Sequence, residues 1–467
     1  MNAVQKKIST ALLIATFLAA IEVTIVSTAM PVIIDDLGGV ELISWVFAIY
    51  LLTSAVTTPI FGKLSDLFGR KIVYIMGVTL FLAGSVLCGL SQTMGQLIAF
   101  RGIQGLGAGA INPVTFTIIA DAFNFEQRAK VQGLISSMWG IAGIFGPVVG
   151  GFFVDYWSWH WIFFINLPFG IVSMWMIGKY FAETLDKKKR RIDYGGAVTF
   201  MLGTGALLYA LLTGGNELAW NSAAIFALFG IAAVLLTAFF IIQVRHPEPM
   251  IPLSLFKKAD VAVSNAGGFL TSAILIGLTV YLPLWIQDVL KLGATSSGLT
   301  LIPISLGWPI GAMLSGRMML RYGTRAAAVL GGLWIALGAI SLAWIDPSTP
   351  TWVLVLIMFL TGLGFGLTTT TFTVVIQSSV EIHMRGAAGS ANTFLRALGQ
   401  TLGVAVLGTV LNQYVAGGAE SAERLADGLH AVFVISAVIA VASWIVTLRI
   451  PQRDYRQAES RTAPDSK

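Results

Sequence analysis

Long runs of apolar residues follow one another along nearly the whole chain, separated by short segments that hold most of the charged residues. Each run is long enough for a helix to cross a hydrocarbon core of about 30 Å. Membrane β-barrel strands would instead show about ten residues of alternating polarity. We therefore predict an all-α membrane protein with spans at 9–30, 43–62, 72–91, 96–119, 130–153, 161–182, 194–213, 222–243, 261–286, 296–316, 326–345, 352–376, 387–412 and 429–449.

The composition supports this class. Of the 467 residues, 56% are hydrophobic and 11% are charged, whereas soluble domains carry roughly 25% charged residues. The net charge of +6 fits contact with the anionic inner leaflet of a lipid bilayer and needs no nucleic acid. The sequence has no Walker-type phosphate loop and no metal-ligand spacing. We expect a protein that is not an enzyme and that needs no cofactor and no metal.

The distribution of positive charge predicts the orientation. If the N-terminus is inside, 25 of the 29 basic residues fall in cytoplasmic segments, and the outer loops keep only Lys291 and Arg424. Cytoplasmic segments of membrane proteins carry such an excess of Lys and Arg. We predict a multi-pass protein of the cell membrane (plasma or inner membrane) with both termini in the cytoplasm.

The sequence also contains an internal duplication. The segment 62–71 is echoed at 316–325, 254 residues later, and the glycines of 105–109 return at 362–366, 257 residues later. Repeated sets of membrane helices are typical of secondary transporters. The predicted domains are a six-helix bundle at 1–185, two inserted helices with linkers at 186–255, a second six-helix bundle at 256–450 and a cytoplasmic tail at 451–467.

Several motifs together resemble the major facilitator superfamily, specifically its fourteen-helix drug:proton antiporter branch. They are 22–31, 62–71, the helix 4 pattern Leu97, Arg101, Gln104, Gly105 and Gly107, the glycine-rich 140–151, and 159–166. The resemblance implies two pseudo-symmetric six-helix bundles with two extra membrane helices between them. It also implies proton-coupled export of amphipathic drug-like compounds by alternating access, which is a multidrug efflux and antibiotic-resistance activity.

Two charged residues inside the spans are candidates for proton coupling. Glu22 is the acidic residue that lies well inside a span, and an ionisable group in a membrane core is costly enough to suggest a function. The alternative is a structural carboxylate that accepts hydrogen bonds from Thr or Ser on a neighbouring helix. The resemblance implies a coupling role for Arg101 as well, although it could instead be a structural hydrogen-bond hub.

A second set of residues is expected to line a substrate cavity. It contains polar and aromatic residues within the spans, although a single aromatic residue can equally face lipid: Asn112, Trp139, Phe145, Trp308, Asn392, Arg396 and Gln400. With Glu22 ionised, Arg101 and Arg396 leave one net positive charge in the core. This charge disfavours doubly charged cations and is compatible with monocationic, zwitterionic or neutral amphiphiles.

A third set is expected to control gating. Asp66 and Arg70 could be a solvated loop pair, but the resemblance implies that they hold the inner helix ends together. The second copy of this loop has Leu320 where Asp66 would be. The other gating candidates are Arg128, Gly143, Gly146, Pro147 and Gly150, of which Gly146 and Gly150 have the spacing for close helix packing.

Two alternative functions stay open at this point. One is a narrow exporter of a single metabolite, antibiotic or siderophore. The other is a receptor or scaffold without transport, which would need soluble domains or long tails that this sequence lacks. We expect the transporter to work as a monomer.

Overall fold

The computed structural model describes residues 1–38, 42–183, 193–215, 218–292, 294–381, 384–415 and 422–452. Residues 186–192 of the first predicted linker and most of the predicted tail at 451–467 lie outside these residues. Within the described residues, fourteen helices are long and apolar enough to cross a membrane, which confirms the predicted number.

The helices run in the order α1 (Ala3–Leu37), α2 (Ile43–Phe68), α3 (Arg70–Gly89), α4 (Met94–Ala122), α5 (Phe125–Tyr156), α6 (Trp161–Phe164), α7 (Asn166–Tyr180), α8 (Tyr194–Thr213), α9 (Ala223–Arg245), η2 (Leu253–Lys257), α10 (Ala259–Leu284), η3 (Trp285–Val289), α11 (Ala294–Tyr322), α12 (Thr324–Leu342), α13 (Thr351–Ser379), α14 (Arg385–Val415) and α15 (Ala422–Thr447).

Several predicted spans differ from the structure in detail, and two of them show the main kinds of difference. The span predicted at 161–182 is divided between the short helix α6 and α7. The span predicted at 9–30 is part of the longer helix α1, because Asn2 and Gln5 form a reciprocal capping box that starts the helix among polar residues. Hydropathy detects only the apolar part of such a helix.

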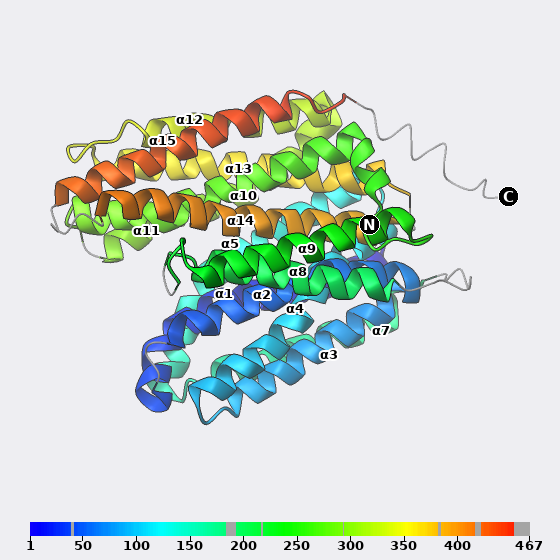
Figure 1. Ribbon diagram of the computed structural model, residues 1–467. Coiled ribbons are helices and arrows are strands. Elements are labelled where there is room, and N and C mark those ends of the chain that lie inside the picture. Colours follow the sequence, from blue (N-terminus) through cyan, green and yellow to red (C-terminus); the bar gives the residue numbers. More distant parts are fainter. Residues whose placement is uncertain are drawn as a thin grey trace.

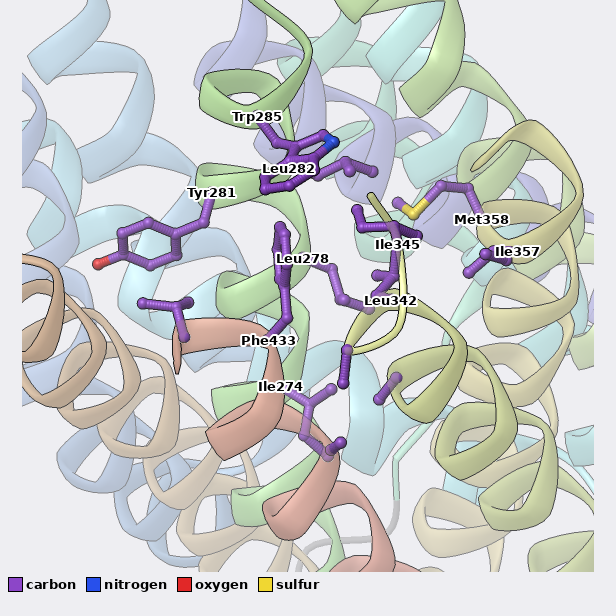
Figure 2. Close-up of a cluster of buried hydrophobic side chains, with 14 of the residues drawn as sticks. Ile274, Leu278, Tyr281, Leu282, Trp285, Leu342, Ile345, Ile357, Met358 and Phe433 are labelled. Carbon is purple, nitrogen blue, oxygen red and sulfur yellow. The ribbon is translucent and has the colours of Figure 1, made fainter. Parts of the chain in front are cut away.

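The helices form two halves, α1–α7 and α10–α15 (Figure 1). The second half is built around a large cluster of buried apolar side chains, which includes Ile274, Leu278, Leu282, Trp285 and Phe433 (Figure 2). The first half has two such clusters of its own, around Tyr74 and around Phe163. Each half therefore has separate packing, while the predicted domain boundaries stay predictions.

The helices α8 and α9 lie across the junction of the two halves (Figure 1). Tyr209 of α8 contacts Trp45 of α2, with ring centroids 5.3 Å apart. Phe200 of α8 contacts Phe394 of α14, with ring centroids 5.1 Å apart. The inserted pair thus touches both halves through aromatic side chains.

The duplicated glycines occupy equivalent places in the two halves. Gly107 of α4 lies against the backbone of α3 at Phe81, and Gly364 of α13 lies against α12 at Gly331 and Ile335. A Cβ atom at either glycine would collide with the neighbouring helix. Close backbone approach of this kind is how small residues hold membrane helices together. The repeat seen in the sequence is therefore also a repeat in helix packing.

Candidate functional site

Glu22 of α1 and Arg101 of α4 form an ion pair inside the first half. Glu22 has no exposed surface and Arg101 is 1% exposed. The Arg101 Nη1 atom also donates to Gln104 Oε1 at 2.8 Å, and its Nε donates to the Val46 carbonyl of α2 at 3.2 Å. The guanidinium lies 4.3 Å from the ring centroid of Tyr50, also on α2. Arg101 thus connects α1, α4 and α2.

The second carboxylate oxygen of Glu22 has its own partner. Asn166 Nδ2 of α7 donates to Glu22 Oε2 at 2.7 Å and lies 3.1 Å from Ser85 Oγ of α3. Gln104 Nε2 donates to the same Ser85 hydroxyl at 2.7 Å. A buried charge is tolerated only when it is paired and hydrogen-bonded in this way. Protonation of Glu22 would leave Arg101 without its counter-charge, so the pair can respond to a proton.

Sequence reasoning missed Tyr50 and Ser85 as members of this cluster, and it quoted Gln104 and Asn166 only as motif residues. All four residues are polar or partly polar side chains within apolar spans. Polarity in such a position is a usable signal, since a buried polar group in a membrane needs a partner. The sequence alone does not indicate that the four gather around the Glu22–Arg101 pair.

Arg396 of α14 lies apart from this cluster, in the second half. Its neighbour one turn earlier, Asn392, donates to Asn265 Oδ1 of α10 at 3.1 Å. The Cα of Gly268 on α10 faces both residues: a Cβ built there would lie 3.4 Å from Arg396 Cγ and 3.4 Å from Asn392 Nδ2. Gln400 follows one turn after Arg396 on the same face of α14 and is half-buried.

The other predicted cavity residues are spread over both halves. Asn112 of α4 is half-buried, and Trp139 of α5 is 47% exposed. Trp308 of α11 stacks on Phe365 of α13 with centroids 5.2 Å apart. Phe145 of α5 is 53% exposed and shares its face with the exposed Ile141 and Val148. The contacts group Asn392 with Arg396, whereas Phe145 lies on an exposed apolar face. The shared cavity stays a prediction.

The gating candidates Asp66 and Arg70 meet the second half at one end of the bundle, which we call the charged end (Asp66, Arg70, Asp121, Arg385). Asp66 accepts the first N–H groups of α14, from Gly386 at 3.1 Å and Ala387 at 3.0 Å. Arg70 pairs with Asp66 at 3.1 Å and with Asp121 at 3.0 Å. Arg385 pairs with Asp121 from the other half at 3.0 Å. A helix N-terminus favours a carboxylate, so Asp66 stabilises the contact between the halves.

Arg128 belongs to the same end of the molecule. Its Nη2 donates to the Ala120 carbonyl at 2.7 Å, and Arg385 Nη1 donates to the same carbonyl at 2.6 Å. Arg128 Nη1 also reaches Ser378 Oγ of α13 at 3.4 Å. The two arginines of the duplication, 257 residues apart, therefore converge from opposite halves on the last turn of α4.

The second copy of the loop lacks this chemistry. Leu320 stands where the first copy has Asp66, and it packs with Met319, Ala327, Val374 and Val375. The turn itself is preserved, because Gly69 and Gly323 both have positive φ, 98° and 86°. Only a residue without Cβ adopts such a conformation at little cost. The backbone is duplicated, whereas the carboxylate contact is made by the first copy.

The glycines of α5 that were predicted to control gating lie where α5 packs against the segment of α1 that carries Glu22. A Cβ atom at Gly146 would collide with Thr24, and one at Gly150 would lie 3.1 Å from Ile25. Thr24 Oγ1 donates to the Ala142 carbonyl of α5 at 3.1 Å. Gly143 faces Ser305 of α11. The side chain of Pro147 lies outside the described part of the structure.

Comparisons with known proteins agree with this architecture. The family model described as Major Facilitator Superfamily matches residues 12–404. The chain is 39% identical over 399 residues to Multidrug resistance protein 3 of Bacillus subtilis (strain 168), covering 85% of this chain and 78% of that protein. It is 37% identical over 403 residues to the Multidrug transporter protein MdtP of the same organism, covering 86% and 74%.

Solved structures support the fold. The human organic anion transporter MFSD10 (TETRAN) superposes with a TM-score of 0.71 at 14% identity, covering 96% of this chain and 100% of that chain. The proton:xylose symporter XylE gives a TM-score of 0.68 at 13% identity, with 97% of each chain covered. Together, the family match and the helix arrangement establish that this multi-pass membrane protein belongs to the Major Facilitator Superfamily.

Proposed function

We propose that this protein exports amphipathic drug-like compounds from the cell in exchange for protons, by alternating access between its two halves. The relatives named as multidrug transporters support the substrate class. The fully buried Glu22–Arg101 pair carries the proposal for proton exchange. A transporter of this type needs a group that changes its charge during the cycle, and intramembrane carboxylates commonly have this role.

The pair can act at a distance through the helices that it joins. Arg101 contacts α2 at Val46 and Tyr50, near one end of that helix, and Asp66 lies near the other end, bonded to α14. Helix α4 likewise carries Arg101 and, at the charged end, Asp121. Protonation of Glu22 would free Arg101 to change its contacts with α2 and α4, which would alter the fit of both helices at the charged end. Coupling is then a shift between two arrangements of the halves.

Protonation of Glu22 is coupled to the substrate through this route rather than by direct contact with the substrate. Every partner that we identify for it, Arg101 and Asn166, belongs to the first half. With the charged end facing the cytoplasm, the arrangement described here is closed on the inside. A proton would then reach Glu22 from the outer side, and its release to the inside would follow the opening of the charged end.

The test is proton-driven transport by the Glu22→Gln variant in everted membrane vesicles with an imposed pH gradient. Glutamine keeps the shape of the protonated acid but cannot release a proton, so we expect uphill transport to be lost while downhill exchange continues. Asp346→Asn is the matched control, because Asp346 lies in an exposed loop. If Glu22→Gln, present at the normal level, still gave uphill transport that a proton ionophore abolished, Glu22 would not be the coupling residue.

The same vesicles separate broad from narrow specificity. A panel of cationic, zwitterionic and neutral amphiphiles should compete with one another if one site accepts many compounds. Competition by a single compound class alone would favour the narrow exporter.

A further inference from the structure

Arg396 is an intramembrane cation that has no counter-charge among the described residues. Among the described residues, no carboxylate, carbonyl or hydroxyl oxygen accepts a hydrogen bond from its guanidinium, and no aromatic ring lies beneath it. Its side chain is only partly buried. An arginine within a membrane span is costly unless it finds a counter-charge or water. The N–H donors of the Arg396 guanidinium can therefore bind a negatively charged group.

The glycines on the same face of α14 show which helices surround Arg396. Gly389, seven residues earlier and thus on the same helix face, lies against the ring of Phe116 on α4. Arg396 is two turns, about 10 Å, farther from the charged end on that face. Gly403, seven residues after Arg396, lies against Ala273 of α10. This face of α14 therefore passes from the first half at Gly389 to α10 at Gly403, and the stem of Arg396 packs on α10 at Gly268.

Neighbouring residues prepare Arg396 to hold a ligand. Gly268 leaves room for the aliphatic part of Arg396 to lie along α10, so that the stem is supported, and the residue keeps part of its surface exposed. Asn392, one turn nearer the charged end, is fixed by its bond to Asn265. The parallel N–H groups of a guanidinium can donate to both oxygen atoms of a carboxylate at once, and an adjacent amide can donate a further hydrogen bond.

The duplication relates Arg396 to a position in the first half. Trp139 of α5 stands 257 residues before Arg396, the offset that relates Arg128 to Arg385 and Gly146 to Gly403. It is one of the large apolar side chains left substantially exposed, at 47%. The equivalent positions thus hold an exposed aromatic side chain in the first half and, in the second half, an arginine without an acceptor among the described residues.

We propose that Arg396 binds the carboxylate of the transported compound, so that the protein prefers amphiphiles with an acidic group, including zwitterions, over purely cationic ones. This inference rests on the proposed function, because it names the substrate class of the same transport site. The acid of the substrate would supply the counter-charge that the fold omits.

The experiment compares an aromatic carboxylic acid with its methyl ester in two assays, equilibrium binding to the purified transporter in nanodiscs and uptake into everted vesicles. For the wild type we expect tighter binding of the acid. In Arg396→Gln the affinity for the acid should fall about tenfold or more, as expected for loss of a charge-assisted hydrogen bond. Binding of the ester should change less than about threefold, which also verifies that the variant is folded.

Two further variants sharpen the result. Arg396→Lys keeps the charge but loses the planar fork, so it should retain a preference for the acid at reduced affinity. Arg321→Gln removes a positive charge from the last turn of α11, where Arg321 lies over the ring of Tyr322, and should leave the ratio of acid to ester affinity unchanged. Equal losses of acid and ester binding in Arg396→Gln, or no preference in the wild type, would overturn the proposal.

The two assays keep this inference distinct from the proposed function. Acid binding that depends on Arg396, without proton-driven uptake of either compound, would support the anion site and contradict the antiporter. Proton-driven uptake of both compounds with no dependence on Arg396 would support the antiporter and contradict the anion site.

Discussion

Arg101 and Arg396, which lie inside the predicted spans 96–119 and 387–412, have opposite surroundings. Arg101, in the first half, is enclosed with Glu22, Gln104 and the Val46 carbonyl, and it is 1% exposed. Arg396, in the second half, is partly exposed and has no acceptor among the described residues. The same residue type thus has its charge neutralised inside the fold at one site and available at the other.

This difference separates two tasks that an antiporter must perform. A charge that is paired internally can report protonation, because loss of its partner changes the fold around it. A charge that is left unpaired can select a ligand, because a ligand of opposite charge supplies the missing counter-charge. The duplication provided both halves with the same backbone, and the substitutions within it give the halves different chemistry.

The most severe test of the comparison is Arg101→Met. Removing Arg101 leaves Glu22 buried without its counter-charge, which costs about 3–5 kcal/mol for a broken buried pair. We expect a strongly lowered unfolding temperature, measured on the detergent-purified protein, and little transport. The double variant Glu22→Gln with Arg101→Met should regain most of the stability, since both charges are gone, but should not regain proton-driven uptake. Full stability of Arg101→Met alone would contradict the pairing described here.

A smaller effect is expected at the charged end. Asp66→Asn retains one acceptor oxygen but loses the charge that faces the N-terminus of α14 and Arg70, a change of about 1–3 kcal/mol. The amides of Gly386 and Ala387 should exchange hydrogen faster, which mass spectrometry of the α14 peptides can measure. The control is Leu320→Asn in the second copy of the loop, where the wild type has no carboxylate. Unchanged exchange in Asp66→Asn would show that the contact does not hold the halves together.

The smallest expected effect is at Asn392. In Asn392→Ala the guanidinium of Arg396 remains, so the affinity for the acid should fall only by about threefold, the value of one neutral hydrogen bond. The nanodisc assay with acid and ester measures it. A loss as large as that in Arg396→Gln would mean that Asn392 mainly positions the arginine through Asn265. No loss at all would restrict the anion site to Arg396.

The sequence predicted the fold more fully than the site. Hydropathy located the fourteen spans because about twenty apolar residues suffice to define one. It did not distinguish buried from lipid-facing residues, since both are apolar in a membrane. Phe163 is fully buried and Phe145 is 53% exposed, although both are phenylalanines in apolar runs. For the same reason, the set of predicted cavity residues could name candidates but could not group them.

By itself, the sequence determined the number of spans, the duplication, the family and the presence of one deep carboxylate, because these features are local or periodic. The tertiary structure decided which charges meet. Glu22 bonds Asn166, 144 residues away, and Asp66 bonds Gly386, 320 residues away. Such pairs form where close packing at glycines brings particular helix faces together. The residue pattern within one helix does not specify which other helix will pack against each of its faces.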